Sequence, residues 1–389
     1  MFGGTFINRF GSFVAVFIVL YLRKLGYSAG DIGLTVAAAG AGSMGATLVG
    51  GQVADRLGRK NAIALSMFLS ATFAVALYEV RTLGLIILFA ALFGLASEMY
   101  RPASSALIAD CVPEANRVAA FAAYRLAINA GFAMGPAVAG LLAESSFAYV
   151  FYGEALTSAA YGLIALFWLP EGTRVRRHEE GRGEFIRTLS RDRVFAVFWL
   201  ATLAIHLVYF QSLSTLPLAV KEAGLSSAAY GTLMSLNGLV IILLEMPVVS
   251  ITQRHPAPWM MGLGALLTGL GFSLTALAFN YPLFALTVFI WSLGEIVHGP
   301  VSAAYVTTLS PERLRGRYQG AWGLSFGVAM VLAPVIGTRL FEVSPALPWI
   351  ACAGLGAAGA LLFAFGPRRT VKPPPAQPPM VEAAGAPES

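Results

Sequence analysis

Charged residues are scarce in this chain. Asp, Glu, Lys and Arg make up 12% of its 389 residues, and 57% are hydrophobic; a soluble globular domain has about 25% charged residues. So few charges cannot cover a surface that faces water on every side, which excludes an ordinary soluble protein. Cysteine is rarer still: Cys111 and Cys352 are the only two. Two isolated thiols exclude a disulfide framework and a cysteine-based metal site.

Signatures of catalysis are also missing. The sequence holds no ATP-binding motif, no phosphate-binding loop, no paired nucleophile and base, and no cluster of metal ligands. We therefore expect a protein that is not an enzyme and that needs no cofactor. If it moves a solute against a gradient, the energy must come from an ion gradient or from the solute itself.

The sequence does have a series of long apolar runs. Each is close to the length of about 20 residues that an α-helix needs to cross the hydrocarbon core. None alternates apolar and polar residues as membrane-spanning strands do. The predicted fold class is therefore all-α and integral to the membrane, with twelve transmembrane helices at 4–22, 31–52, 61–80, 83–108, 118–142, 147–169, 194–219, 229–250, 259–279, 282–308, 318–340 and 343–366.

The positive charges predict an orientation. Of the 26 Lys and Arg residues, eighteen fall in the segments that are cytoplasmic if both termini are inside, five fall outside and three lie within helices. This asymmetry is the positive-inside rule. We expect a multi-pass protein of the bacterial cytoplasmic (inner) membrane with cytoplasmic N- and C-termini. The net charge of +6 then reflects topology, and no nucleic-acid partner is expected.

The chain repeats itself. At an offset of 198 residues, without a gap, glycines, arginines and prolines coincide along most of the overlap: Gly26 with Gly224, Gly33 with Gly231, Arg56 with Arg254, Pro102 with Pro300, Pro113 with Pro311, Arg117 with Arg315, and Pro136 with Pro334. Two copies of one hydrophobic unit are typical of a membrane transporter whose site lies between its halves.

The repeat and the composition divide the chain into four parts. We predict an N-terminal six-helix bundle at 1–170, an arginine-rich cytoplasmic linker at 171–193, and a C-terminal six-helix bundle at 194–366. Residues 367–389 are rich in Pro, Ala and Glu. Such a tail cannot bury enough apolar surface to fold, so we expect it to be disordered and cytoplasmic.

The loop after the second run carries a motif, GQVADRLGRK at 51–60. It resembles the G-x-L-A-D-R-x-G-R-K signature of the major facilitator superfamily, with Val53 in the Leu position. Glycine permits tight turns and close helix approach, and Asp55 can cap a helix N-terminus or pair with arginine. The resemblance implies two pseudo-symmetric six-helix bundles and a cytoplasmic gate, closed in the outward-facing state, at Gly51, Asp55, Arg56, Gly58, Arg59, Lys60 and Asp110. The alternative is that the basic residues only anchor the topology.

A second motif lies in the fifth run, NAGFAMGPAVAG at 129–140. It resembles the G-x-x-x-G-P-x-x-G motif of proton-coupled drug antiporters, at Gly131, Gly135, Pro136 and Gly140. Small residues let helices approach closely and proline kinks them, so ordinary packing is the alternative. The arginine that such antiporters often carry in the fourth helix is replaced here by Ala90. Residues 293–300, LGEIVHGP, resemble a tenth-helix Gly-Glu-Ile-Val of a smaller antiporter group that also lacks that arginine.

Ionisable residues within the runs are candidate functional sites, because each costs about 2.5 to 3.5 kcal/mol on insertion scales. Glu295 is the strongest, since it lies near the middle of the tenth run, and His298 follows three residues later on the same helix face. A carboxyl group there can hold either a proton or the charge of a cationic substrate. A structural hydrogen bond is the alternative.

Further charges are expected in the N-terminal half. Glu98 and Arg101 are spaced to share a cavity face, and Arg125 and Asn129 lie at similar depth on the fifth run. They predict an ion-pair cluster, either functional or static. Glu245 lies nearer the cytoplasmic end and suits a second proton site or a structural role. Arg9 and Glu154 are the weaker candidates, because both suit an interfacial position. The remaining candidates for lining the substrate cavity are Tyr124, His206, Gln211 and Asn237.

These features together predict a function. We expect a proton-coupled antiporter that exports small amphipathic drug-like compounds, cationic or neutral, by alternating access. The alternative is a carrier of the same superfamily for an anionic metabolite or sugar, with Arg101 and Arg125 as the substrate clamp. The expected partners are a small-molecule substrate, protons and the lipid bilayer. We expect the chain to act as a monomer.

Overall fold

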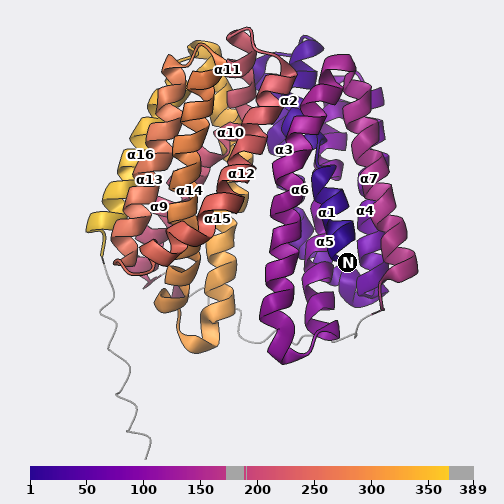
Figure 1. Ribbon diagram of the computed structural model, residues 1–389, viewed down its shortest axis with the longest axis horizontal. Helices are drawn as coiled ribbons and strands as arrows, with labels where there is room; N and C mark the ends of the chain where they lie inside the picture. The colour runs from indigo at the N-terminus through magenta and orange to yellow at the C-terminus, as the bar shows by residue number, and fades with distance from the viewer. Residues whose placement is uncertain (172–187, 190, 368–389) are drawn as a thin grey trace, which may run out of the picture.

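The computed structural model describes residues 1–171, 188–189 and 191–367. Within them the chain forms helices and no strand (Figure 1). The predicted linker lies mostly outside the described residues, and the predicted tail lies outside them beyond Pro367. The α-helices of the first half are α1 (Phe2–Phe10), α2 (Val14–Lys24), α3 (Ala29–Leu57), α4 (Arg59–Glu79), α5 (Leu83–Cys111), α6 (Arg117–Ser145) and α7 (Phe147–Trp168). Those of the second half are α9 (Arg193–Tyr209), α10 (Gln211–Ser214), α11 (Leu216–Glu222), α12 (Ser227–Thr252), α13 (Ala257–Ser273), α14 (Tyr281–Leu309), α15 (Arg315–Val343) and α16 (Leu347–Phe365).

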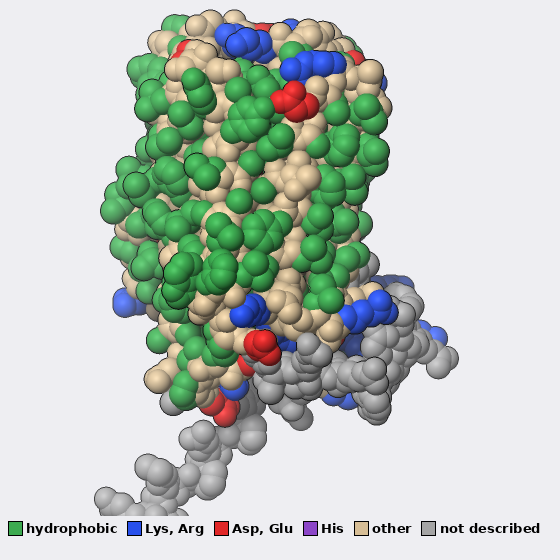
Figure 2. Space-filling model, turned by 90° about the vertical axis from the view of Figure 1, so that its right-hand side faces the viewer, with side chains coloured by type: hydrophobic (Ala, Val, Ile, Leu, Met, Phe, Trp, Pro, Cys, Tyr) green, Lys and Arg blue, Asp and Glu red, His purple; other side chains and the backbone are tan. Residues whose placement is uncertain are grey.

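The predicted membrane fold is confirmed. Eleven helical segments among the described residues are long and apolar enough to cross a bilayer, and α3 makes a twelfth when its two bent parts count as one span. Figure 2 shows hydrophobic side chains over the middle of one face, with the Lys, Arg, Asp and Glu of that face gathered toward its two ends. This is the surface that a bilayer requires, because lipid tails solvate apolar side chains and water solvates charged ones.

The helices lie in two groups, α1–α7 and α9–α16 (Figure 1). Within the first, α5 packs against α3 and α4, and α4 against α7. Within the second, α13 packs against α14 and α16. The groups meet through α6 with α12, α3 with α15, and α2 with α10 and α11.

The two ends of the molecule differ. We call the end where α7 stops and α9 starts the linker end, and the other end, where α2 meets α11, the closed end. In Figure 1 the ribbons of the two groups lie together at the closed end, at the top, and diverge toward the linker end, at the bottom. The structure thus has one closed end and one end at which the two groups stand apart.

Local sequence signals set the helix ends. Ser28, Ser146, Ser226 and Asn280 each accept a backbone N–H of the first turn of the helix that follows, which is the preferred way to satisfy these otherwise unpaired donors. Gly58 separates α3 from α4 with a φ of 88°, a conformation that favours glycine.

The first and seventh spans are broken, which the sequence did not predict. We expected continuous helices at 4–22 and 194–219, but α1 stops at Phe10 and α2 starts at Val14, and α9 stops at Tyr209 before the short α10 and α11. Neither break contains proline within the interruption, and an apolar run reads alike whether its helix is straight or broken. Backbone groups at membrane depth need partners. At the breaks most backbone N–H groups still donate to backbone carbonyls, and that of Val14 donates to the side chain of Glu154.

Candidate functional site

An ion-pair cluster lies in the first bundle. Glu98 on α5 pairs with two arginines: one carboxylate oxygen accepts a hydrogen bond from Arg9 Nη2 at 3.1 Å, and the other forms an ion pair with Arg101. Arg9 Nε also donates to the Tyr100 hydroxyl at 3.0 Å. The Arg9 side chain is 12% exposed and that of Arg101 is 50% exposed. Glu98 and Arg101 therefore lie together as expected, but their buried partner is Arg9, which we had placed at the interface.

Arg125 does not belong to this cluster. Its guanidinium on α6 pairs with Glu245 on α12, across the two bundles. Our expectation of a cluster with Glu98 and Arg101 was wrong, because helix spacing fixes depth but not rotation, and α6 turns this face toward α12. Glu245, for which we considered a second proton site or a structural role, is the partner of that arginine. Asn129, one turn further along α6, is half-buried.

A second polar cluster surrounds Glu295 on α14. Asn237 Nδ2 on α12 donates to Glu295 Oε2 at 3.0 Å and to Ser292 Oγ at 3.0 Å. The Tyr209 hydroxyl at the end of α9 also hydrogen-bonds to Glu295. Three helices thus hold one carboxyl group, and each of these partners is an uncharged amide or hydroxyl.

His298 lies apart from Glu295, contrary to our expectation of one shared face. Its Nδ1 is 3.5 Å from the carbonyl oxygen of Met261 on α13, and its ring packs against Phe363 on α16. Glu295 instead points to α12. The three-residue spacing turns the two side chains apart by enough for different neighbouring helices to hold them. His298 is 5% exposed and is a packing residue inside the second bundle.

The other cavity candidates are held within their own bundles. His206 Nδ1 lies 3.1 Å from Ser325 Oγ, and Gln211 Nε2 donates to the carbonyl oxygen of Ala333 at 3.2 Å. Both contacts join the seventh span to α15. Tyr124 is 8% exposed, and its buried hydroxyl finds no hydrogen-bond partner among the described residues. Burial of this kind does not suit contact with a diffusing substrate.

The gate motif is assembled at the linker end, within the first bundle. Arg59 Nη1 donates to Asp55 Oδ1 at 2.8 Å, and Arg59 Nε lies 3.7 Å from Asp110 Oδ2. The Arg59 side chain is 9% exposed, whereas that of Asp55 is 46% exposed. Arg56 is exposed and Lys60 is half-buried. A side chain at Gly51 would meet open space, so the close helix approach that we expected there is absent in this state.

The glycines of the motif at 129–140, which lies on α6, face two different neighbouring helices. A side chain at Gly131 or Gly135 would strike the backbone of α1 around Phe10, whereas one at Gly140 would strike α12 near Ala228. The motif therefore lets α6 pack closely against α1 of its own bundle and against α12 of the second bundle. Ser235 Oγ on α12 accepts from the backbone N–H of Ala137 at 2.9 Å between these two contacts.

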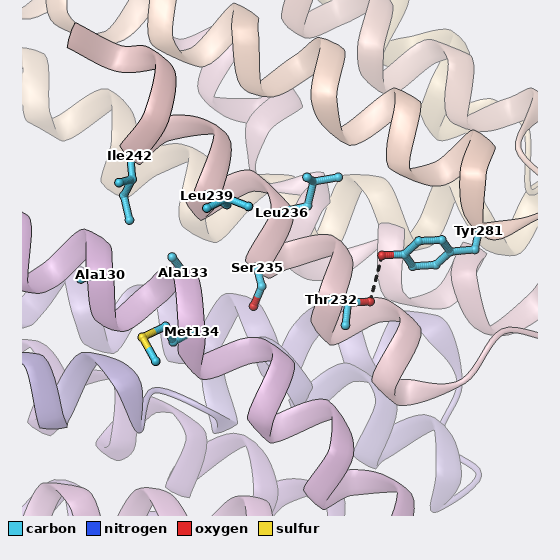
Figure 3. Close-up of a pocket in the computed structure, with 9 residues that line it drawn as sticks. All are labelled: Ala130, Ala133, Met134, Thr232, Ser235, Leu236, Leu239, Ile242 and Tyr281. Atoms are coloured by element: carbon cyan, nitrogen blue, oxygen red, sulfur yellow. Dashed lines mark hydrogen bonds between the residues drawn. The ribbon is translucent and has the colours of Figure 1, made fainter.

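A groove of about 420 Å³ lies beside this contact, between α6 and α12 (Figure 3). Its side chains are mostly apolar, and its polar edge is a 3.1 Å hydrogen bond between Tyr281 and Thr232. None of our predicted coupling or cavity residues lines it. The groove is therefore distinct from the polar clusters at Glu98 and Glu295.

Glu154 is a polar site that sequence reasoning undervalued. It lies on α7 and is 3% exposed, not interfacial as we expected. Its Oε2 accepts the backbone N–H of Val14 at 2.6 Å and so caps the N-terminus of α2 at the break in the first span. The sequence signal that could have pointed to Glu154 is the dipeptide Gly11-Ser12 inside an apolar run. It indicates a helix break, and the free N–H groups of the helix that follows need a buried acceptor nearby.

These arrangements define a class of protein. Paired bundles of membrane-spanning helices carry carboxyl and guanidinium groups at membrane depth, and no group of three or more potential metal-binding residues occurs in the described part of the chain. That is the construction of a secondary transporter. The Major Facilitator Superfamily model matches residues 1–226 and 212–387, and the chain belongs to that superfamily.

Curated relatives are transporters of the same kind. The chain is 26% identical over 377 residues to the uncharacterized MFS-type transporter YqjV of Bacillus subtilis, covering 93% of this chain and 87% of that protein. It is 24% identical to a Na(+), Li(+), K(+)/H(+) antiporter of Planococcus maritimus, over 86% of each chain. It is also 24% identical to the multidrug resistance protein MdtH of Klebsiella pneumoniae, over 92% of each.

Solved structures share the fold. A POT peptide transporter superposes with a TM-score of 0.77 at 19% identity, covering 93% of this chain and 91% of that one. A bacterial homolog of the human lysosomal transporter Spinster, in an inward-facing and unoccupied conformation, gives a TM-score of 0.71 at 15% identity, over 94% of this chain and 92% of that one. At these identities the likeness concerns the fold alone.

Proposed function

We propose that this transporter is a proton-coupled antiporter that exports small amphipathic compounds, cationic or neutral, by alternating access. The observation that carries the proposal is the setting of Glu295. Its carboxyl group lies at membrane depth and is held by Asn237 and Tyr209, both uncharged. A carboxyl group without a fixed cationic partner can take up a proton or a cationic substrate in exchange, which is the requirement of antiport.

The relatives support the same reading. One is a cation/proton antiporter and another a multidrug resistance protein, and both match over most of their length. Exchange of a cation for a proton requires a membrane-embedded group that can accept positive charge. Glu295 is the residue of this chain that supplies it in our proposal.

The alternative substrate, an anionic metabolite or sugar, needs free arginines. Arg101 already pairs with Glu98, and Arg125 with Glu245. To bind an anion, either guanidinium would first have to give up a carboxylate partner, at a cost that the anion would have to offset. The ion pairs therefore favour a cationic or neutral substrate.

In this proposal the linker end faces the cytoplasm of a bacterial inner membrane, as the positive charges suggest. The structure then corresponds to a state closed outside. Arg59 already contacts both Asp55 and Asp110, and the three residues would lock the linker end once the bundles close there. A proton that enters from outside displaces the substrate from Glu295, and its release inside resets the carrier.

Transport by reconstituted protein tests the proposal. Proteoliposomes with a trapped pH-sensitive dye receive ethidium, an alkali-metal chloride, an organic anion or a sugar, and proton movement is recorded after each. We expect ethidium to drive proton exchange in the wild type and in the control Glu79→Gln, and Glu295→Gln to abolish it while the protein still folds. Unchanged proton coupling in Glu295→Gln would disprove the role of this residue, and proton exchange with the anion or sugar alone would favour the alternative.

A further inference from the structure

Two carboxylates join the bundles at the closed end. Glu144, in the last turn of α6, accepts the backbone N–H of Ala228 in the first turn of α12 at 2.9 Å. Glu342, in the last turn of α15, accepts the backbone N–H of Gly30 in the first turn of α3 at 2.6 Å. Each contact runs from the end of a helix in one bundle to the start of a helix in the other.

The two contacts are images of each other under the internal repeat. The offset of 198 residues that brings Gly33 onto Gly231 also brings Glu144 onto Glu342 and Gly30 onto Ala228. The N-caps follow the same register, because Ser28 and Ser226 each accept the N–H three residues on, at 3.1 Å in both cases. The contacts are therefore built twice, once in each direction across the interface.

Helix packing beside the contacts obeys the same symmetry. A side chain at Gly33 on α3 would meet the carbonyl oxygen of Pro334 on α15, and one at Gly231 on α12 would meet that of Pro136 on α6. The helices thus approach closely enough at this end for each glutamate to reach the facing helix. Toward the linker end the ribbons diverge (Figure 1).

The chemistry of the contacts suits a latch that opens. The first turn of a helix presents unpaired N–H donors and a partial positive charge, which a carboxylate satisfies. Both glutamates are exposed, so water can replace the contact at small cost when the helices part. Glu342 also accepts a hydrogen bond from Arg339 Nη1 at 3.0 Å, three residues before it on the same helix.

We propose that Glu144 and Glu342 form a paired latch that holds the closed end shut, and that the transport cycle must break both contacts to open that end. The inference rests on the proposed alternating-access cycle. It assigns to the closed end a device distinct from the Asp55 motif, which lies at the other end of the first bundle. Since both contacts span the same interface, opening requires the loss of both.

The expected effect is a shift in the population of the state open at this end. Removing one exposed carboxylate from a helix N-terminus should shift an equilibrium by roughly two- to fivefold. If the two effects multiply, the double variant shifts it by roughly four- to twenty-five-fold. The glutamine variants should shift it less than the alanine variants, because the amide oxygen still accepts a hydrogen bond but carries no charge.

Distance measurements on the full chain in lipid nanodiscs test the latch without any substrate. Spin labels at Thr82→Cys and Phe279→Cys, both exposed at the closed end, are placed in a background of Cys111→Ser and Cys352→Ala. We expect the long-distance fraction to rise in Glu144→Ala and in Glu342→Ala, and to rise further in the double variant. The matched control is Glu79→Ala, whose carboxylate lies at the same end but accepts from Tyr152 within its own bundle.

The outcomes separate this inference from the proposed function. A double variant with the wild-type distance distribution would overturn the latch, whatever Glu295→Gln does in transport. Conversely, Glu295→Gln that still couples protons would refute the proton site and leave the distance result standing. A rise in the control as large as in the single latch variants would also overturn the latch, because it would show a general effect of lost surface charge.

Discussion

At membrane depth, the glutamates of this chain differ in what they contact. Glu98 is shared by two arginines, Glu245 meets Arg125, and Glu154 caps a helix N-terminus. Glu295 has Asn237 and Tyr209, which are uncharged. A glutamate in an ion pair must leave an opposite charge behind when it is protonated, which is costly where water is excluded. Glu295 and Glu154 form no ion pair among the described residues, but the Glu154 carboxylate serves a backbone N–H at a helix break, so we propose Glu295 as the exchanging residue.

This difference predicts opposite results for two buried glutamates. Glu154→Gln should retain proton-coupled transport of ethidium, because its carboxylate serves the backbone N–H of Val14 and the amide oxygen can replace it. Glu154→Ala should lose the cap and lower the Tm by a few degrees, the equivalent of about 1 kcal/mol. Thermal unfolding in detergent and the dye assay measure the two effects. Transport that is lost in Glu154→Gln as completely as in Glu295→Gln would contradict the division of roles.

At the scale of helices, the sequence predicted the positions of the membrane spans well, but it did not predict which neighbouring helix each polar side chain contacts. The number, depth and rough bounds of the spans follow from hydropathy, because a bilayer imposes a minimum apolar length. The breaks at Gly11 and Phe210 could not be predicted in this way, since hydropathy does not report where a helix is interrupted. The contacts of individual side chains could not be predicted either. Arg125 faces α12 and His298 faces α13 because of the rotation and tilt of their helices. Packing sets this rotation and tilt, and residue spacing in one sequence does not reveal them.

The glycines of the two motifs allow an element-scale prediction. Gly135→Val should lower the Tm by several degrees, because the new side chain would strike the backbone of α1. Gly51→Ala should leave the Tm unchanged or raise it slightly, since alanine meets open space at this position within α3 and favours helix. Ethidium transport by Gly51→Ala should nevertheless slow if the linker end closes tightly around this glycine in the other state. A Gly51→Ala protein with wild-type transport would contradict close approach there.

At the scale of the whole molecule, the two ends are held in different ways. The closed end joins the bundles through backbone N–H groups, small residues and the contact of Phe17 with Tyr230, whose ring centroids lie 5.6 Å apart. At the linker end, the ion pairs of Arg59 with Asp55 and Asp110 stay within the first bundle. In the proposed alternating-access cycle, the bundles rock as rigid bodies about the contacts between α6 and α12 and between α3 and α15, opening one end as the other closes.

The Arg125–Glu245 ion pair bridges the bundles on the linker side of these contacts, and its charges can be exchanged to test the bridge. Arg125→Glu places two carboxylates together, and Glu245→Arg places two guanidinium groups together, so each single reversal should push α6 and α12 apart. The double reversal restores opposite charges at the same separation. We expect each single variant to lower the rate of ethidium-driven proton exchange severalfold and the double variant to recover most of it, as a coupling of about 1 kcal/mol or more between adjacent charges implies. A double variant no faster than the slower single variant would show that the bundles do not depend on this bridge, and rocking would then rest on the backbone contacts alone.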